Sequence, residues 1–134
     1  MTTALVAVVA ALVLAALVGW LLTRRAGVVR AVGSDVDTAD LGLSSDGPTV
    51  VHFSAAWCAP CDRVRRVVSQ VCGDLGDVTH VEIDMDANPA AARRLSVLSL
   101  PTTFIFDGDG RQRYRSAGVP KAEDLRSALT PLLA

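Results

Sequence analysis

Cys58 and Cys61 are the two residues of this chain whose type and spacing point most directly to chemistry. An apolar run that begins at Val50 leads into the pair, and a segment with helical periodicity follows it, so the pair lies where a helix begins. The first N–H groups of a helix have no partner within it, and together with the helix dipole they stabilise a thiolate. Cys58 is therefore the candidate nucleophile.

A Cys-x-x-Cys pair is compatible with either a metal site or a redox dithiol. Zinc sites usually need a second pair of ligands, and Cys72, His52 and His80 lack ligand-like spacing, so we predict no metal. Redox chemistry requires one thiol that is open to attack and a second thiol behind it that resolves the mixed disulfide. Cys58, before the helix, and Cys61, inside its first turn, meet this requirement.

The helix predicted over Pro60–Cys72 supports this placement. Its apolar stripe, with members at i, i+3, i+4 and i+7, consists of Val64, Val67, Val68 and Val71. Pro60 suits the first turn, because no N–H is needed there. Cys72 shares the buried stripe, and we interpret it as a small core residue, with a regulatory or third redox thiol as the alternative.

Strand and helix signals alternate along the rest of the chain, which predicts an α/β architecture. The predicted strands are Thr49–Ala55, Val78–Met85, Thr102–Asp107 and Arg113–Ala117. Helices are predicted over Pro60–Cys72, Pro89–Leu95 and Lys121–Leu133. A brief strand over Val28–Val32 and a weak helical stretch over Asp37–Leu43 precede them. Asp107–Gly110 lacks the spacing of a calcium loop and is interpreted as a hairpin turn.

The N-terminal segment has the composition of a membrane span. Residues 4–22 carry no charge, and as a helix they extend about 28 Å, enough to cross the hydrocarbon layer. A cleavable signal peptide is the alternative, but it needs a basic region before the apolar run, where this chain has only threonines after Met1. Arg24, Arg25 and Arg30 follow the span. Because basic flanks stay preferentially in the cytoplasm, we predict a single-pass membrane protein with a cytoplasmic domain.

Charge is distributed unevenly along the chain. All 14 acidic residues lie at or after Asp35, whereas residues 1–33 contain three arginines and no acid. Residues 34–134 hold 10 basic and 14 acidic residues, a net charge of −4, so no nucleic-acid-binding face is predicted. We divide the chain into an anchor (1–25), a connector and domain entrance (26–47) and a domain core (48–134).

The chain resembles the thioredoxin family over residues 27–134. The resemblance is carried by the run from Trp57 to Cys61 and by Leu100-Pro101-Thr102, with Pro101 standing 40 residues after Cys61. Further matches are Asp86–Pro89 and Gly118. The resemblance implies a thioredoxin fold, which is a central mixed sheet flanked by helices. In this chain one predicted N-terminal transmembrane helix precedes that fold.

The resemblance also implies a thiol–disulfide oxidoreductase that reduces protein disulfides. In the family's reaction the thiolate matched by Cys58 attacks a substrate disulfide, and the thiol matched by Cys61 resolves the mixed disulfide. The redox-active disulfide between these residues takes the place of a cofactor. The implied partners are proteins that contain disulfides and an electron donor such as a thioredoxin reductase. The lipid bilayer is the predicted partner of residues 4–22.

Other matched positions imply supporting roles around the dithiol. Pro101 matches a cis proline that packs against the dithiol, and with Leu100 and Thr102 it forms the segment that binds the extended substrate. Trp57 would shield the dithiol and offer contact surface, with simple packing as the alternative. Pro60, the second residue between the cysteines, is common in reducing members of the family.

The chain departs from the family at two positions. Thioredoxins have a buried aspartate six residues before the nucleophile and a lysine one strand away, and His52 and Glu82 occupy these positions here. Imidazole can accept a proton from Cys61, and Glu82 can orient the ring or favour its charged form. A cationic His52 would make the disulfide more oxidising. The alternatives are a core histidine without a kinetic role and, for His80, a surface or hydrogen-bonded core histidine.

Two other functions stay under consideration. One is a non-catalytic interaction module that keeps the fold and a structural disulfide, against which the presence of Cys58, Cys61, Trp57 and Pro101 counts. The other is the same oxidoreductase located outside the cytoplasm, where disulfides are made or repaired.

Overall fold

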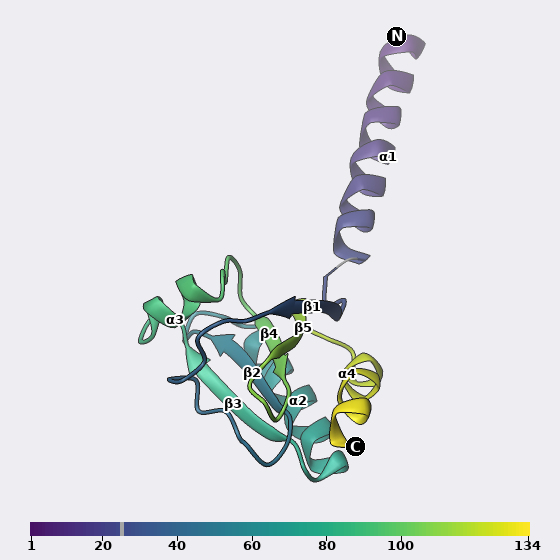
Figure 1. Ribbon diagram of the computed structural model, residues 1–134. Coiled ribbons are helices and arrows are strands. Elements are labelled where there is room, and N and C mark those ends of the chain that lie inside the picture. Colours follow the sequence, from purple (N-terminus) through teal and green to yellow (C-terminus); the bar gives the residue numbers. More distant parts are fainter. Residues whose placement is uncertain (25) are drawn as a thin grey trace.

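The computed structural model describes residues 1–24 and 26–134 and contains a five-stranded sheet flanked by helices (Figure 1). The strands are β1 (Arg30–Ser34), β2 (Thr49–Ser54), β3 (Thr79–Asp84), β4 (Thr102–Phe106) and β5 (Gln112–Ala117). Their order across the sheet is β1-β5-β4-β2-β3, in which β2 and β3 are parallel and the other neighbours are antiparallel. The predicted α/β class with a mixed sheet is confirmed.

Three helices cover the two faces of this sheet. They are α2 (Cys61–Leu75), α3 (Pro89–Arg94) and α4 (Ala122–Leu129). Val51 and Phe53 of β2 pack in a cluster with α3, whereas Val50 packs in a second cluster with α2 and α4. Because side chains alternate along a strand, His52 and Ser54 share the face of Val50. His52 therefore lies on the side of the sheet that is covered by the helix beginning at the dithiol.

The apolar stripe predicted for α2 faces the core. Val64, Val68 and Val71 are fully buried, and Val67 packs against the same cluster. Cys72 is buried beside them, as predicted for a small core residue. Burial raises the pKa of the Cys72 thiol to about 11, so this cysteine stays a protonated thiol near neutral pH.

The weak helical stretch predicted over Asp37–Leu43 is wrong. The segment forms turns, in which the Asp37 carboxylate accepts the N–H of Ala39 and the N–H of Leu41 bonds the carbonyl of Thr38. A side-chain acceptor that bonds the nearby backbone competes with helix formation. Leu41 is buried in the cluster on the α3 face and holds the segment there without a helix.

The last predicted helix, over Lys121–Leu133, is shorter than expected. The α-helix α4 ends at Leu129, and a 3₁₀ helix over Thr130–Leu133 continues the chain. Pro131 has no N–H with which to bond the carbonyl four residues earlier, so the α-helical pattern stops there.

Helix α1 (Thr2–Arg24) precedes the sheet and projects away from it (Figure 1). Its mean hydropathy is 2.9 in the most apolar window, and none of that window is buried. The helix has the length and composition of a membrane span, and signal sequences share both properties.

The chain enters the domain soon after α1. The N–H of Gly27 donates to the carbonyl of Ala117 at 2.5 Å, and the N–H of Gly118 donates to the carbonyl of Pro101 at 2.9 Å. Gly27 has a φ of +80°, and a Cβ atom there would lie 2.1 Å from the carbonyl oxygen of Val119. Glycine is therefore required at the point where the connector joins the Pro101 end of the sheet.

Candidate active site

The two cysteines form a disulfide between the end of β2 and the start of α2. Their sulfur atoms are 2.07 Å apart and their Cα atoms 5.5 Å apart. Cys58 is 8% exposed and Cys61 is 1% exposed, so Cys58 is the more accessible residue of the pair. The Sγ atom of Cys61 lies 4.0 Å from the carbonyl oxygen of Phe53 on β2. The structure thus places an outer and an inner sulfur at one helix terminus.

Pro60 lies immediately before α2 rather than inside its first turn. Its carbonyl oxygen accepts the N–H groups of Arg63 at 3.1 Å and Val64 at 3.3 Å, so Pro60 caps the helix. The helix therefore begins at Cys61, and its N-terminus is adjacent to the disulfide. The helix dipole and the first N–H groups favour a thiolate at this place.

The segment around Pro101 packs beside the dithiol. The Leu100–Pro101 peptide bond is cis, as expected from the resemblance. Leu100 packs against the small cluster of Ala55, Cys58 and Cys61. The hydroxyl of Thr102 donates to the carbonyl of Ser99 at 2.7 Å and holds the turn before β4. The structure therefore brings together the two cysteines and the predicted substrate-binding segment.

Trp57 stands at the surface next to the dithiol. Its side chain is 68% exposed, and its indole N–H donates to Oδ2 of Asp86 at 3.0 Å. Asp86 follows β3, and its own N–H is held by the carboxylate of Asp84 at 2.8 Å. This bond orients an apolar ring beside Cys58. Leu98, which precedes the Pro101 segment, is a second exposed apolar side chain at 92% exposure.

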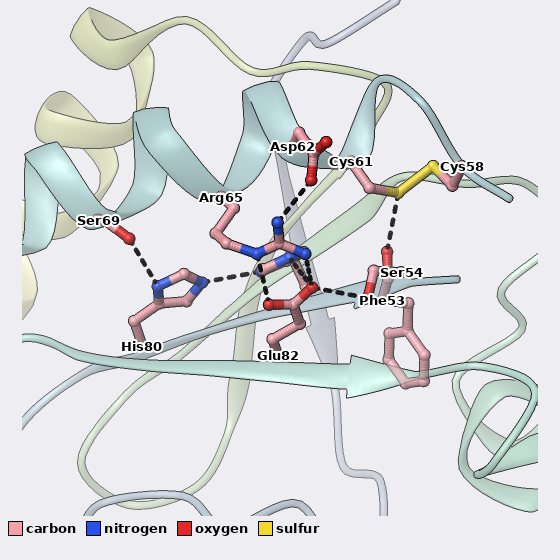
Figure 2. A network of polar contacts seen from close by, with 10 residues as sticks. Phe53, Ser54, Cys58, Cys61, Asp62, Arg65, Ser69, His80 and Glu82 are labelled. Carbon is pink, nitrogen blue, oxygen red and sulfur yellow. Dashed lines mark hydrogen bonds and ion pairs between the residues drawn. A yellow bond between two sulfur atoms is a disulfide. The ribbon is translucent and has the colours of Figure 1, made fainter. Parts of the chain in front are cut away.

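Glu82 lies at the centre of a polar network beneath α2 (Figure 2). The Arg65 guanidinium donates to both of its carboxylate oxygens, at 2.8 and 2.5 Å, and the Ser54 hydroxyl donates at 2.8 Å. Arg65 also pairs with Asp62 at 2.5 Å. The hydrogen bonds from Arg65 are the main reason why the pKa of Glu82 falls to about 2. Glu82 is therefore a fixed carboxylate.

His52, which is fully buried, and His80, which is half-buried, form a pair next to this network. The Nδ1 atom of His52 lies 2.8 Å from Nε2 of His80. Nδ1 of His80 lies 3.4 Å from Oγ of Ser69 (Figure 2). His52 is fully buried, and that burial, together with the nearby His80, lowers its pKa to about 4. His52 is neutral at neutral pH, which opposes the cationic state considered from the sequence. A neutral imidazole is able to accept a proton.

Comparison with known proteins identifies the family. The family model named Thioredoxin matches residues 36–131. The chain belongs to the thioredoxin family. A thioredoxin from Mycolicibacterium smegmatis is 40% identical over 91 residues, which cover 66% of this chain and 80% of that protein. A thioredoxin from Streptomyces clavuligerus is 33% identical over 106 residues, which cover 79% of this chain and 98% of that protein.

The fold of this thioredoxin-family protein also matches solved structures. The crystal structure of chloroplastic thioredoxin z aligns with a TM-score of 0.59 and 32% identity, over 65% of this chain and 79% of that chain. The predicted thioredoxin fold is confirmed. The protein is a thiol–disulfide oxidoreductase that acts through a cysteine disulfide without a cofactor. Disulfide-containing proteins are the substrates of the family, and a reductase is its electron donor.

Three residues of this site were not recognised in the sequence of the thioredoxin-family protein. Arg65 reads as one of several solvent-facing residues of an amphipathic helix, His80 as an ordinary strand residue, and Asp86 only as part of a family match. The one available signal was the charge-reversed pair of His52 and Glu82. Because these two residues differ from those of the family, they need different interaction partners. Arg65 is the partner of Glu82, and His80 is the partner of His52.

Proposed function

We propose that this protein reduces disulfides in other proteins through Cys58 and Cys61. The observation that carries the proposal is the outer and inner arrangement of the two sulfurs at the start of α2. The Cys58 thiolate attacks a substrate disulfide, and Cys61 then attacks Cys58, so the substrate leaves reduced and the Cys58–Cys61 disulfide forms. A thioredoxin reductase returns the pair to the dithiol.

The residues around the dithiol take part in binding the substrate. Trp57 and Leu100 offer apolar surface on two sides of the cysteines, and the backbone of Leu100, Pro101 and Thr102 receives an extended substrate segment. Pro60 caps α2 and so keeps the helix terminus directed at Cys58. The exposure of Trp57 and the packing of Leu100 against the cysteines support these roles.

Insulin reduction tests the proposed activity. The full chain in detergent micelles, supplied with NADPH and a thioredoxin reductase, is expected to precipitate insulin chains catalytically. The Cys58→Ser variant serves as the control, because it keeps every other residue and lacks the attacking thiol. If the wild-type protein is reduced by dithiothreitol but still fails to turn insulin over, the protein is an interaction module with a structural disulfide.

We also propose that α1 is a retained membrane anchor with the thioredoxin domain in the cytoplasm. The support is its length and hydropathy, its complete exposure, and the basic residues that follow it. The Arg24 guanidinium lies 3.5 Å from the centre of the Trp20 ring, a pair typical of a membrane–water interface. The division into an anchor, a connector and a domain core agrees with this role.

The short connector favours substrates near the membrane. Gly27 already bonds the domain at Ala117, next to the Gly118 that bonds Pro101. Consecutive Cα atoms are about 3.8 Å apart, so the three residue steps from Arg24 to Gly27 span at most about 11 Å. The Pro101 end of the sheet therefore stays close to the end of the anchor. Tethering at this distance raises the effective concentration of membrane-associated disulfides.

Labelling of intact cells tests the location. A membrane-impermeant maleimide is expected not to label the reduced protein before lysis and to label Cys58 after lysis. The Cys58→Ser variant controls for the other thiols. Labelling of Cys58 in intact cells would instead place the domain outside the cytoplasm and would require a membrane relay as its electron donor.

A further inference from the structure

Leu98 is the most exposed large apolar side chain among the described residues of the domain. Leu98 is 92% exposed, and Trp57 is the next at 68%. Both lie close to the dithiol, because Trp57 precedes Cys58 and Leu98 stands two residues before Leu100, which packs against the two cysteines. A single exposed leucine is common at protein surfaces, so its meaning depends on whether the fold holds it in place.

The start of the loop that carries Leu98 is fixed by the way in which α3 ends. The N–H of Ser96 donates to the carbonyl of Arg93 at 3.0 Å, and the N–H of Val97 donates to the carbonyl of Ala92 at 2.8 Å. These are the two hydrogen bonds of a Schellman motif, in which the left-handed residue after the helix is usually glycine. Here that residue is Ser96, with a φ of +54°. A residue with a Cβ atom disfavours this conformation, so neighbouring contacts must hold it.

Arg115 supplies such contacts from β5. Its guanidinium donates to the carbonyl of Leu95 at 2.8 Å and to the carbonyl of Ser96 at 2.5 Å. It also lies 5.0 Å from the centre of the ring of Phe104, its cross-strand neighbour on β4. A guanidinium can bond two carbonyls at once because its donors form a rigid planar fork. Arg115 therefore ties the end of α3 to the sheet.

The rest of the loop is held at two further points. Val97 is buried in the core cluster on the α3 face, and the carbonyl of Ser99 accepts the hydroxyl of Thr102 at 2.7 Å. Leu98 lies between these two points. In Figure 1 the loop between α3 and β4 rises clear of the sheet. Because the residues on both sides of Leu98 are held, the fold itself directs this side chain to the surface.

Leu98 is within reach of a substrate that lies on the dithiol. Two residue steps separate Leu98 from Leu100, so their Cα atoms are at most about 7.6 Å apart. An extended substrate segment covers a similar length with about two residues, at about 3.3 Å for each. A side chain about two residues from the substrate cysteine therefore meets Leu98. Removal of apolar surface from water favours an apolar side chain at that place.

We propose that Arg115 positions this loop so that Leu98 binds an apolar side chain about two residues from the reacting cysteine of a substrate. The proposal rests on the disulfide reduction proposed above and names the class of substrate that the protein prefers. Leu98 contacts the substrate, whereas Arg115 acts only through the loop and is a positioning residue. The contact adds binding beside the dithiol and leaves the exchange at Cys58 unchanged.

The test compares two peptide disulfides. Each is a symmetrical dimer of a peptide with one cysteine, and the second residue on both sides of that cysteine is leucine in one peptide and serine in the other. The reduced full chain in detergent micelles is mixed with each dimer, and formation of the Cys58–Cys61 disulfide is followed by alkylation and mass analysis. For the wild type the second-order rate constant is expected to be about tenfold higher with the leucine peptide, below the effect of burying a complete leucine.

Variants of Leu98 test the contact. In Leu98→Ala the preference for the leucine peptide is expected to fall to about twofold, because most of the apolar surface is lost, while the serine peptide reacts at the wild-type rate. Leu98→Met should keep the wild-type preference, since methionine has a similar volume and is also apolar. Because Leu98 is exposed, both variants are expected to fold like the wild type.

Variants of β5 test the positioning role. Arg115→Lys keeps the charge but cannot bond both carbonyls, so the preference is expected to fall to about threefold with the serine peptide unaffected. Arg113→Lys is the matched control and should keep the wild-type preference, because Arg113 lies on the same strand and pairs with Asp107. If Arg115→Lys loses its near-UV circular dichroism, the double variant Ser96→Gly/Arg115→Lys takes its place. Glycine adopts the left-handed conformation without strain, and the same fall in preference is expected.

Equal rates of the two peptides with the wild type would overturn the proposal. A preference that persists in Leu98→Ala would contradict the contact, because the micelle or another surface would then recruit the leucine side chains. An equal loss of rate with both peptides in this variant would contradict it too, since Leu98 would not select between them. A full preference in a folded variant that lacks Arg115 would refute the positioning role. If the reduced wild type reacts with neither peptide, the proposed function itself is removed.

Discussion

Replacement of Cys61 by serine is expected to turn this oxidoreductase into a trap for its substrates. Cys58 keeps its place before α2 and still attacks a disulfide, but no inner thiol then displaces the substrate. Insulin turnover should fall on the order of 10³-fold or more, as it does when residues that act as a unit lose a member. A mixed disulfide between Cys58 and the substrate should accumulate, and non-reducing electrophoresis followed by mass analysis measures it.

Two further cysteine variants control this experiment. Cys58→Ser should lose turnover equally but form no mixed disulfide, because Cys61 is only 1% exposed. Cys72→Ser should turn over insulin like the wild type, since Cys72 is buried and its thiol has a pKa of about 11. Equal amounts of mixed disulfide in the Cys58→Ser and Cys61→Ser variants would contradict the assignment of outer and inner roles.

Acidification is expected to destabilise the domain through His52. The folded protein holds the pKa of His52 at about 4, whereas the unfolded chain has the ordinary value near 6.5. Between these values the unfolded state binds the extra proton, so the free energy of unfolding falls as the pH falls from about 6.5 to 4. The full effect is about 3 kcal/mol. Thermal unfolding followed by near-UV circular dichroism across this range measures it.

The groups around His52 define the control. His80 and Glu82 face the ring from β3, Arg65 acts on it from α2, and Thr103 is its uncharged neighbour on β4. The pKa of Glu82 is lowered to about 2 from 4.5, so its own contribution is lost mainly below the window of His52. In His52→Gln the decline between pH 6.5 and 4 should flatten. An unchanged decline in this variant would assign it to other groups.

Much of the site could be predicted from the sequence because its signals are local. The spacing of Cys58 and Cys61, the valine stripe that follows and the apolar run of β2 all lie within a few turns of one another along the chain. Such patterns depend on the periods of helices and strands, which act over short distances. The role of the segment around Pro101 was predicted from the resemblance to thioredoxins. The segment Asp37–Leu43 was wrongly predicted to be helical. It forms turns, and burial of the single residue Leu41 holds it against the core.

The interaction partners of His52 and Glu82 could be identified only from the tertiary structure. His80 is 28 residues from His52, and Arg65 is 17 residues from Glu82. The parallel register of β2 and β3 places Glu82 beside His52 and His80 beside Val50, all on the face beneath α2. A shift of one residue in this register would turn both β3 side chains to the other face of the sheet. No local pattern specifies that register.

By itself, the sequence determined a reactive cysteine pair at a helix start, an α/β domain and an apolar N-terminal helix. The tertiary structure decided the charge states beside the pair. His52 is neutral because the fold buries it. The Glu82 carboxylate accepts its hydrogen bonds from Arg65 and Ser54 rather than from the imidazole. The physical reason is that desolvation and hydrogen bonding depend on which groups surround a side chain in space. Residue identity sets only the starting value of a pKa.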